Sequence, residues 1–177
     1  MTELVFKRAQ AGDIPALHRL IQSAYRGASA KQGWTHEADL LDGQRTDAEE
    51  LADIIADDRQ RLIMAHQGHN LVACVCVVSK GDNRAYLGML SVDPALQAGG
   101  LGRQLIAEAE AVARTDFATK VMEMTVIAQR PELIAYYERR GYALTAETRP
   151  FPLHDPRFGH AKRQDLYFVV MEKALFK

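Results

Sequence analysis

The sequence of 177 residues is poor in cysteine, in tryptophan and in excess charge of either sign. Its 22 basic and 23 acidic side chains give a net charge of −1, whereas proteins dedicated to nucleic acids or anionic membranes carry a basic excess. No apolar run approaches the ~18 residues that a membrane span requires. The N-terminal segment joins no basic leader to an apolar stretch, so we do not expect secretion. From the charge balance and the short apolar runs we expect neither a nucleic-acid nor a membrane partner.

The two cysteines, Cys74 and Cys76, stand two residues apart in an apolar run. In a strand their side chains point to one face and lie too far apart for a disulfide. Free thiols and the missing leader favour a reducing, cytoplasmic location. A zinc site formed by these thiols with His66 and His69 is disfavoured, because the sulfurs would lie within a buried strand, and we expect no metal.

Strand and helix patterns alternate through a single domain, residues 1–177, without repeats or linkers. Helices are predicted after a cap at Asp13, after a capping box over residues 46–49, from Leu101, and from Pro131 to the residue before Gly141. Residues 27–45 are predicted to form a loop with at most a helical turn. Strands are predicted at 2–8, 61–65, 71–78, 85–92, 120–127, 143–148 and 166–171. The order β-α-α-β-β-β-α-β-α-β-β predicts a mixed α/β domain.

The most informative stretch, residues 90–103, runs from a strand through a glycine-rich loop into a helix. Main-chain N–H groups of such a loop and the helix dipole bind phosphate without a basic patch, and glycine lets the anion approach closely. The P-loop pattern fails because no Gly-Lys-Ser/Thr follows. The dinucleotide pattern fails because Leu105 stands in place of its third glycine. From the residues alone, a purely structural turn remains the alternative.

Two spaced motifs resemble those of the GNAT superfamily of N-acetyltransferases. Residues 97–102 read Gln-x-x-Gly-x-Gly, preceded by Val-x-Pro at 92–94, like the superfamily's pyrophosphate-binding motif. Residues 137–142 read Tyr-x-x-x-Gly-Tyr, like the end of its later helix. The resemblance implies the GNAT fold, with a mostly antiparallel twisted sheet flanked by helices. It also implies that acetyl-CoA donates an acetyl group to a primary amine, that is, an acyltransferase.

The resemblance further implies where the cofactor lies. Pantetheine and the acetyl carbonyl would pair with the main chain of Leu90 and Val92, and the pyrophosphate would rest on amides of the loop. Arg103 either adds charge there or is solvated. Arg130 stands where the superfamily often has Asn, and it either reaches the cofactor or faces solvent. The implied cofactor-binding residues are Leu90, Ser91, Val92, Gln97, Ala98, Gly99, Gly100, Leu101, Gly102, Arg103 and Arg130.

Tyr137 falls where the superfamily has a Tyr whose hydroxyl protonates the leaving thiolate. The alternative is a core tyrosine, although Tyr136 faces another side of the helix and suits packing better. A non-catalytic acyl-CoA-binding sensor or regulatory module would keep the glycine-rich loop equally well, but the retained Tyr137 favours an enzyme. The resemblance also allows a homodimer through sheet edges or terminal strands.

The acceptor side is predicted in the loop before the second helix. An amine with a pKa near ~10.4 must lose a proton before it attacks, so the site needs a proton acceptor. Glu37 is the first candidate base, with Asp42 or Asp39 behind it, and Trp34 is a candidate pocket wall. The alternatives are solvated carboxylates and a tryptophan that anchors the loop.

Charge is uneven along the chain despite its neutral sum. Residues 37–58 hold nine acids and one base, and residues 149–163 hold four bases and one acid. Because the acidic stretch begins on the predicted acceptor loop, we expect a cationic small-molecule or peptide amine. A solvated acidic helix is the alternative explanation. Phe151 and Phe158 lie in a Pro-containing loop and are predicted to line the pocket rim or to cover the core.

Overall fold

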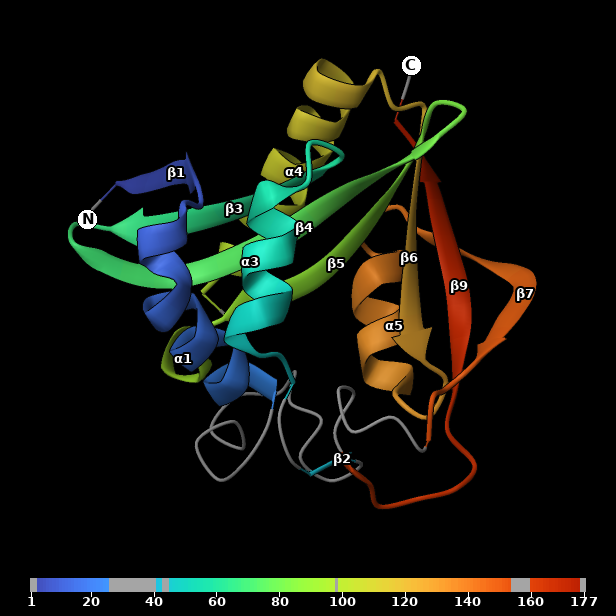
Figure 1. Cartoon of the computed structure of the whole chain (residues 1–177). Helices are drawn as coiled ribbons and strands as arrows, with labels where there is room; N and C mark the ends of the chain where they lie inside the picture. Colours follow the sequence, from blue (N-terminus) through green and yellow to red (C-terminus); the bar gives the residue numbers. More distant parts are fainter. Residues whose placement is uncertain (1–2, 26–40, 43–44, 98, 154–159, 176–177) are drawn as a thin grey trace.

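The computed structural model describes residues 3–25, 41–42, 45–97, 99–153 and 160–175. A seven-stranded sheet in the order β1-β3-β4-β5-β6-β9-β7 carries helices on both faces (Figure 1). The strands are β1 (Leu4–Arg8), β3 (Gln60–Gln67), β4 (Asn70–Gly81), β5 (Arg84–Val92), β6 (Val121–Ile127), β7 (Ala143–Pro150) and β9 (Tyr167–Ala174). The helices are α1 (Ile14–Tyr25), α3 (Ala48–Ala56), α4 (Leu101–Phe117) and α5 (Pro131–Glu138). The mixed α/β prediction is therefore confirmed.

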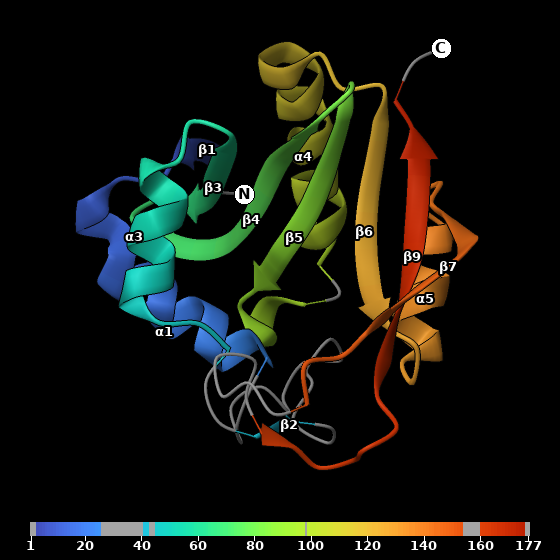
Figure 2. The same ribbon diagram turned by 45° about the vertical axis from the view of Figure 1, so that its right-hand side comes forward.

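Alternation of side chains along the strands divides the core into two layers. One layer lies under α1 and α3, and the predicted stripe of Leu17, Leu20, Ile21 and Ala24 is the buried face of α1. The other layer lies under α4 and α5, where Leu105 and Ala109 pack on Val75 and Met122. Figures 1 and 2 show the two helix pairs on opposite faces of the sheet.

Among the strand pairs in the described part of the sheet, only β5–β6 is parallel, and it is short. Residues 84–86 of β5 pair with residues 121–123 of β6, after which the strands diverge (Figure 2). A bulge in the β4–β5 pairing accompanies the divergence, and Met89 there adopts a left-handed backbone with φ of 56°. Bulges bend a strand and increase its twist, so this one turns the end of β5 away from β6.

The bulge is held by side chains on both sides of the strand. The Ser91 hydroxyl donates a hydrogen bond to the Met89 carbonyl at 3.0 Å, and the Met89 side chain is buried in the layer under α1 and α3. A non-glycine residue in the left-handed region costs roughly 1–2 kcal/mol, which these contacts offset. The sequence gives no hint of this bulge, because Met89 is neither Gly nor Asn.

The predicted start of the first helix is correct, and the predicted start of the second is wrong by one residue. Residues 11–13 form a short 3-10 turn, η1 (Ala11–Asp13), and α1 begins after it at Ile14. The Asp13 carboxylate accepts a hydrogen bond from the Gln10 N–H at 2.8 Å instead of capping α1. At α3 the cap is Asp47, whose carboxylate accepts from the Glu50 N–H at 2.7 Å, and not the residue before it. At α3 two adjacent residues, Thr46 and Asp47, are both of a capping type, and Asp47 is the one that caps.

The predicted loops hold a further small sheet. The strands β2 (Leu41–Asp42) and β8 (His160–Ala161) pair with each other. The loop prediction for 27–45 is therefore wrong at residues 41–42, and most of that segment lies outside the described residues. The pairing joins segments about 120 residues apart, and no local pattern encodes it.

Cys74 and Cys76 are free and buried, as predicted. Both lie in the layer under α1 and α3. Within the described ranges, no helix has the length and apolar character needed to cross a membrane. The same residues contain no group of three His, Cys, Asp or Glu side chains arranged to hold a metal ion.

Candidate active site

The glycine-rich loop is fixed by hydrogen bonds at both ends. The Asp93 carboxylate accepts from the Ala95 N–H at 3.0 Å and starts a 3-10 turn, η2 (Pro94–Leu96). The Gln97 amide then reaches back to the Val92 carbonyl at 3.1 Å. Gly100 stands at the N-cap of α4 with φ of 83°, a left-handed backbone that glycine adopts without strain.

This geometry leaves the first N–H groups of α4 available to a ligand. The first intrahelical bond in the described residues runs from the Gln104 N–H to the Gly100 carbonyl at 3.2 Å. N–H groups of the first turn before it have no helical partner, and the positive end of the helix dipole adds to their attraction for an anion. The loop and helix start thus form a phosphate cradle.

A cavity of about 590 Å³ opens over this cradle. It is bounded by the end of β5, the start of α4 and one side of α5, and it holds guanidinium groups from three arginines. The Nε of Arg140 is buried without a hydrogen-bond partner in the described part of the chain, and the group stacks on the Tyr136 ring at 4.4 Å. The lining residues include Leu90, Val92, Gln97, Gly99, Gly100, Gly102, Arg103, Arg139 and Arg140.

Gly102 allows α5 to approach the start of α4 closely. A Cβ added at this position would lie 2.6 Å from the Tyr136 hydroxyl oxygen, which is closer than real Cβ atoms come. The floor of the cavity therefore depends on the absence of a side chain at Gly102. Together with the positively charged walls, this tight cradle suits a pyrophosphate.

A second, smaller cavity of about 230 Å³ lies where β5 and β6 diverge. It is lined by strand residues from both sides of the gap and by Phe151, Phe168, Arg45 and Arg130. Tyr25, Leu90, Leu133 and Tyr137 line both cavities, so the two spaces meet at these side chains.

Tyr137 is 7% exposed at this junction. Its ring makes edge contacts with Tyr136, at 5.4 Å between centroids, and with Tyr142 at 6.3 Å. Burial raises the pKa of Tyr137 well above its usual value, and the neighbouring Tyr25 and Tyr136 raise it further. The hydroxyl therefore stays protonated at neutral pH and can donate a hydrogen bond or a proton at the wall between the two cavities.

Comparison with known families decides the class of this protein. The family model described as "Acetyltransferase (GNAT) family" matches residues 15–142. The chain belongs to the GNAT acetyltransferase family. It is thus of the acetyl-CoA-dependent N-acetyltransferase class, and acetyl-CoA is the donor that the family implies. No curated protein matches the chain by sequence.

Solved GNAT structures share the fold at low sequence identity. A ribosomal-protein-alanine N-acetyltransferase from Escherichia coli superposes with a TM-score of 0.71 at 18% identity, over 99% of this chain and 96% of that chain. A chimera of the spermidine N-acetyltransferase of Vibrio cholerae with hSSAT gives 0.69 at 15% identity, over 98% and 96%. The IAA acetyltransferase of Bacillus cereus gives 0.67 at 15% identity, over 97% and 99%. These matches support the fold.

Most of the cofactor residues implied by the GNAT resemblance gather at the first cavity. The side chains of Ser91 and Leu101 do not line it: Ser91 is buried at the bulge, and Leu101 packs in the core. Arg130 lines only the second cavity and is 4% exposed, so it does not face solvent. Ala98 lies outside the described residues.

The predicted acceptor-side residues cannot be placed in the same way. Trp34, Glu37 and Asp39 lie outside the described residues, and Asp42 is described only as a residue of β2. Phe151 lines the second cavity and also belongs to a small buried cluster with Ile127 and Leu166, whereas Phe158 lies outside the described residues.

Tyr25 and Arg45 line the cavities without having been recognised in the sequence. Tyr25 ends α1, and its hydroxyl donates a hydrogen bond to the Leu90 carbonyl. The Arg45 guanidinium lies 5.2 Å from the centre of the Tyr25 ring. The only sequence feature that could have pointed to Tyr25 is its position as an aromatic residue at the end of an amphipathic helix. Its partner Leu90 is 65 residues away in the sequence, so the contact could not be predicted.

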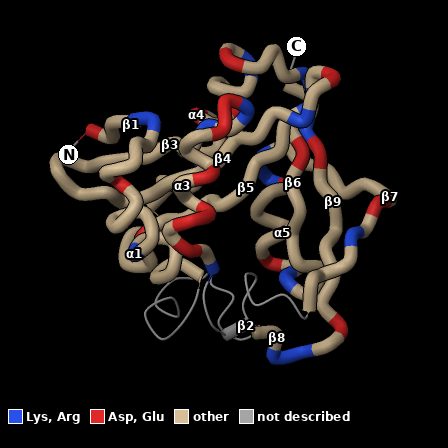
Figure 3. The backbone as a smooth tube through the Cα atoms, in the orientation of Figure 1, with Lys and Arg blue, Asp and Glu red and all other residues tan. Residues whose placement is uncertain are grey.

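The acidic residues of the 37–58 stretch that are described gather along α3 (Figure 3). Glu49, Glu50 and Asp53 line a separate surface cavity of about 420 Å³ together with Arg45 and Asp47. By contrast, no Asp or Glu is among the described residues that line the second cavity.

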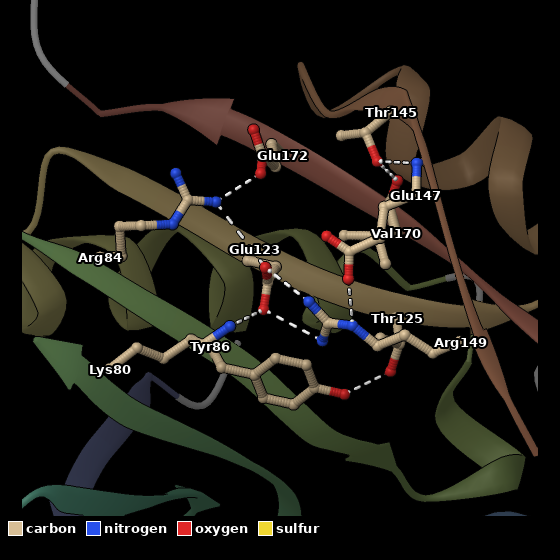
Figure 4. Close-up of polar contacts among 10 residues, drawn as sticks. All are labelled: Lys80, Arg84, Tyr86, Glu123, Thr125, Thr145, Glu147, Arg149, Val170 and Glu172. Atoms are coloured by element: carbon tan, nitrogen blue, oxygen red, sulfur yellow. Dashed lines mark hydrogen bonds and ion pairs between the residues drawn. The ribbon is translucent and has the colours of Figure 1, made fainter.

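A buried carboxylate ties the strands together beside the diverging pair (Figure 4). Glu123 on β6 is 2% exposed and accepts hydrogen bonds from Lys80 at 2.5 Å and from the Arg149 guanidinium at 3.0 and 3.3 Å. Arg84 lies 3.7 Å from Glu123 and also pairs with Glu172. These contacts join β4, β5, β6, β7 and β9 at the point where β5 and β6 last pair.

Proposed function

We propose that this protein transfers the acetyl group of acetyl-CoA to a primary amine of a small molecule or peptide by direct attack on the thioester. The observation that carries the proposal is the position of Tyr137, in the wall that a phosphate-cradle cavity shares with a second cavity. A cofactor held by the cradle and by the main chain of Leu90 and Val92 would place its thioester near this junction. The acceptor would then enter from the second cavity.

Tyr137 acts in this proposal as the general acid. The amine nitrogen bonds to the acetyl carbon, the bond from that carbon to sulfur breaks, and the Tyr137 hydroxyl gives its proton to the sulfur. The proton released by the amine returns to solvent through a base, and Tyr137 is reprotonated. The hydroxyl carries its proton before each turnover, as this role requires, because its pKa lies well above neutral pH.

The proton acceptor is proposed to be Glu37, with Asp42 or Asp39 as alternatives, and Trp34 to form a wall of the acceptor pocket. These assignments rest on the sequence alone. The predicted attraction of a cationic amine is supported by the acidic residues of α3 (Figure 3), whose field extends over about 8–10 Å at physiological salt. Both buried free thiols support the predicted cytoplasmic location.

The alternative proposal is a non-catalytic acyl-CoA-binding sensor or regulatory module. Release of free thiol from acetyl-CoA in the presence of an amine panel separates the two. We expect turnover, and we expect Tyr137→Phe to lower kcat about 100-fold, with the Kd of coenzyme A changed less than twofold. Tyr167→Phe, at a tyrosine that is 43% exposed on β9, serves as the matched control.

An unaffected kcat in Tyr137→Phe would remove the proposed role of the hydroxyl. Coenzyme A binding without turnover of any amine would favour the module over the enzyme.

A further inference from the structure

Arg130 presents a buried guanidinium group with an unused donor. Its side chain is 5% exposed, and its Nη2 has no hydrogen-bond partner in the described part of the chain. Its ion pair runs from Nε to a Glu132 oxygen at 3.9 Å, and that glutamate is 58% exposed. A buried charge without full pairing is costly, so this group is expected to gain an anionic partner when the site is filled.

The main chain of Arg130 is held firmly at the edge of the second cavity. Its N–H donates to the Ile127 carbonyl at 3.0 Å, and its own carbonyl accepts from the N–H groups of Leu133 and Ile134, both at 3.1 Å. The residue is the N-cap of α5, with Pro131 next to it. Strand β6 and helix α5 therefore fix the position of the Arg130 main chain. Specific recognition of a ligand requires a side chain held on such a rigid support.

The chemistry of the second cavity favours an anion attached to an apolar body. Its described walls are mostly aliphatic and aromatic, and they include Arg45 and Arg130 but no Asp or Glu. A planar guanidinium binds a carboxylate through two parallel hydrogen bonds, and a low local dielectric strengthens the pair. The acidic residues of α3 line a different cavity, which Arg45 also borders, so the anion site is assigned to Arg130 and not to Arg45.

The location assigns the anion to the acceptor rather than to the cofactor. Arg130 lines only the second cavity, whereas Arg103, Arg139 and Arg140 line the first, where the pyrophosphate is proposed to lie. The second cavity, at about 230 Å³, is below the range of roughly 300–1,000 Å³ in which drug-sized ligands bind. It therefore suits a small acceptor whose amine reaches the junction at Tyr137.

We propose that Arg130 binds a carboxylate of the acceptor, and that the acceptor is a small amino acid with an apolar side chain. The inference rests on the proposed function and deepens it. It also departs from the predicted cationic acceptor: the ammonium group remains, but a carboxylate balances its charge, so a zwitterion replaces a net cation and a polyamine is disfavoured. Arg130 is thus a specificity-determining residue, and Tyr137 remains the group at the reacting atoms.

The test compares matched acceptors that differ only in the carboxylate. Wild-type protein is assayed with leucine, methionine and phenylalanine, with their amides, and with the corresponding decarboxylated amines. We expect kcat/KM to be at least about 30-fold higher for at least one free amino acid than for its amide. We expect Arg130→Met to abolish this preference by lowering kcat/KM for the amino acid while changing the amide less than threefold.

Further measurements separate this role from a structural one. Arg130→Lys keeps the charge without the planar fork and should recover only part of the preference. Arg59→Gln, at an arginine that is 78% exposed, controls for the loss of one positive charge. Binding of N-acetylphenylalanine and of its amide to the coenzyme A complex, followed by calorimetry, gives a readout without turnover. Thermal unfolding and the Kd of coenzyme A establish that Arg130→Met is folded.

The outcomes distinguish the two proposals. If wild-type protein acetylates amines without preferring the carboxylate, the assignment of Arg130 is wrong and the proposed function stands. Equal losses for all acceptors in Arg130→Met, or a raised KM for acetyl-CoA alone, would also overturn the assignment. If no amine is acetylated and N-acetylphenylalanine does not bind, both proposals fall.

Discussion

The hydroxyl of Tyr25 donates a hydrogen bond to the main-chain carbonyl of Leu90, which joins the last residue of α1 to the bulged end of β5. Both residues line both cavities. The helix end and the strand proposed to bind pantetheine are therefore positioned by one contact. Since β5 has lost its β6 partner at this point, the bond from Tyr25 replaces part of the support that a neighbouring strand would give.

We expect Tyr25→Phe to weaken acetyl-CoA binding more than it weakens the fold. Loss of one hydrogen bond costs about 1 kcal/mol, which for a chain of this size lowers Tm by about 2–4 °C. The freed strand edge should raise the KM for acetyl-CoA several-fold. Steady-state kinetics and thermal unfolding check both, with Tyr167→Phe as the control. An unchanged KM would show that Tyr25 does not position Leu90.

The close approach of Tyr136 to Gly102 gives a second prediction. Alanine normally stabilises a helix relative to glycine by about 1 kcal/mol, but here the new Cβ would lie 2.6 Å from the Tyr136 hydroxyl oxygen. We therefore expect Gly102→Ala to lower Tm and to weaken coenzyme A binding at least tenfold. Calorimetric unfolding and titration with coenzyme A measure the two effects.

The double variant Gly102→Ala/Tyr136→Phe separates the clash from the cradle. Without the hydroxyl, the next nearest atom to the added Cβ is the ring carbon at 3.7 Å, an ordinary contact. Stability should return while coenzyme A binding stays weak, because the Cβ still fills the cradle. Gly12→Ala, whose Cβ would meet nothing within 4 Å, is the control. Recovery of both properties would mean that Gly102 serves packing alone.

Local patterns were enough to predict the fold and the phosphate cradle. The stripe of α1, the helix start at Leu101 and the Gly-x-Gly motif each depend on residues within one or two turns of one another. Their periodicity and backbone freedom are properties of short segments. The family match over residues 15–142 confirms the resemblance that these segments suggested.

The rest of the site depends on contacts between distant segments. Tyr25 reaches Leu90 across 65 residues, and the left-handed backbone at Met89 runs against the preference of that residue, so the sequence does not predict the bulge. Arg130 was expected either at the cofactor or in solvent, because the sequence does not show which cavity the start of α5 faces. The structure excludes the solvent alternative, since Arg130 is 4% exposed and lines the second cavity. These relationships arise from packing, which is not a property of any short segment.

The buried thiols give a third prediction, on reactivity. Burial raises the pKa of Cys74 and of Cys76 to about 12, so at pH 8 almost no thiolate is present. We expect neither thiol to react with a disulfide reagent in the native protein and both to react after unfolding in guanidinium. Counting released chromophore per chain checks this. Rapid reaction of either thiol in native protein would contradict the buried arrangement.

The fourth prediction concerns Glu123, whose carboxylate joins four strands (Figure 4). Burial alone would raise the pKa of this carboxyl, but hydrogen bonds from Arg149 and Lys80 outweigh it and hold the pKa below the ordinary 4.5. The group binds its proton less readily when folded than when unfolded. Its contribution to stability is therefore fully present above about pH 4.5 and is lost as the pH falls through the folded value.

We expect Glu123→Gln to lower the free energy of unfolding by about 3 kcal/mol at pH 7, because it leaves Lys80 and Arg149 facing a neutral group at a buried position. Urea unfolding between pH 7 and pH 3.5 measures this, and the difference from wild type should shrink below pH 4.5. Glu147→Gln is the matched control, since Glu147 also pairs with Arg149, at 2.6 Å, but is 52% exposed. An exposed pair contributes only about 0–1 kcal/mol. A loss in Glu123→Gln that stays constant with pH would show that the side chain acts by its shape and not by its charge.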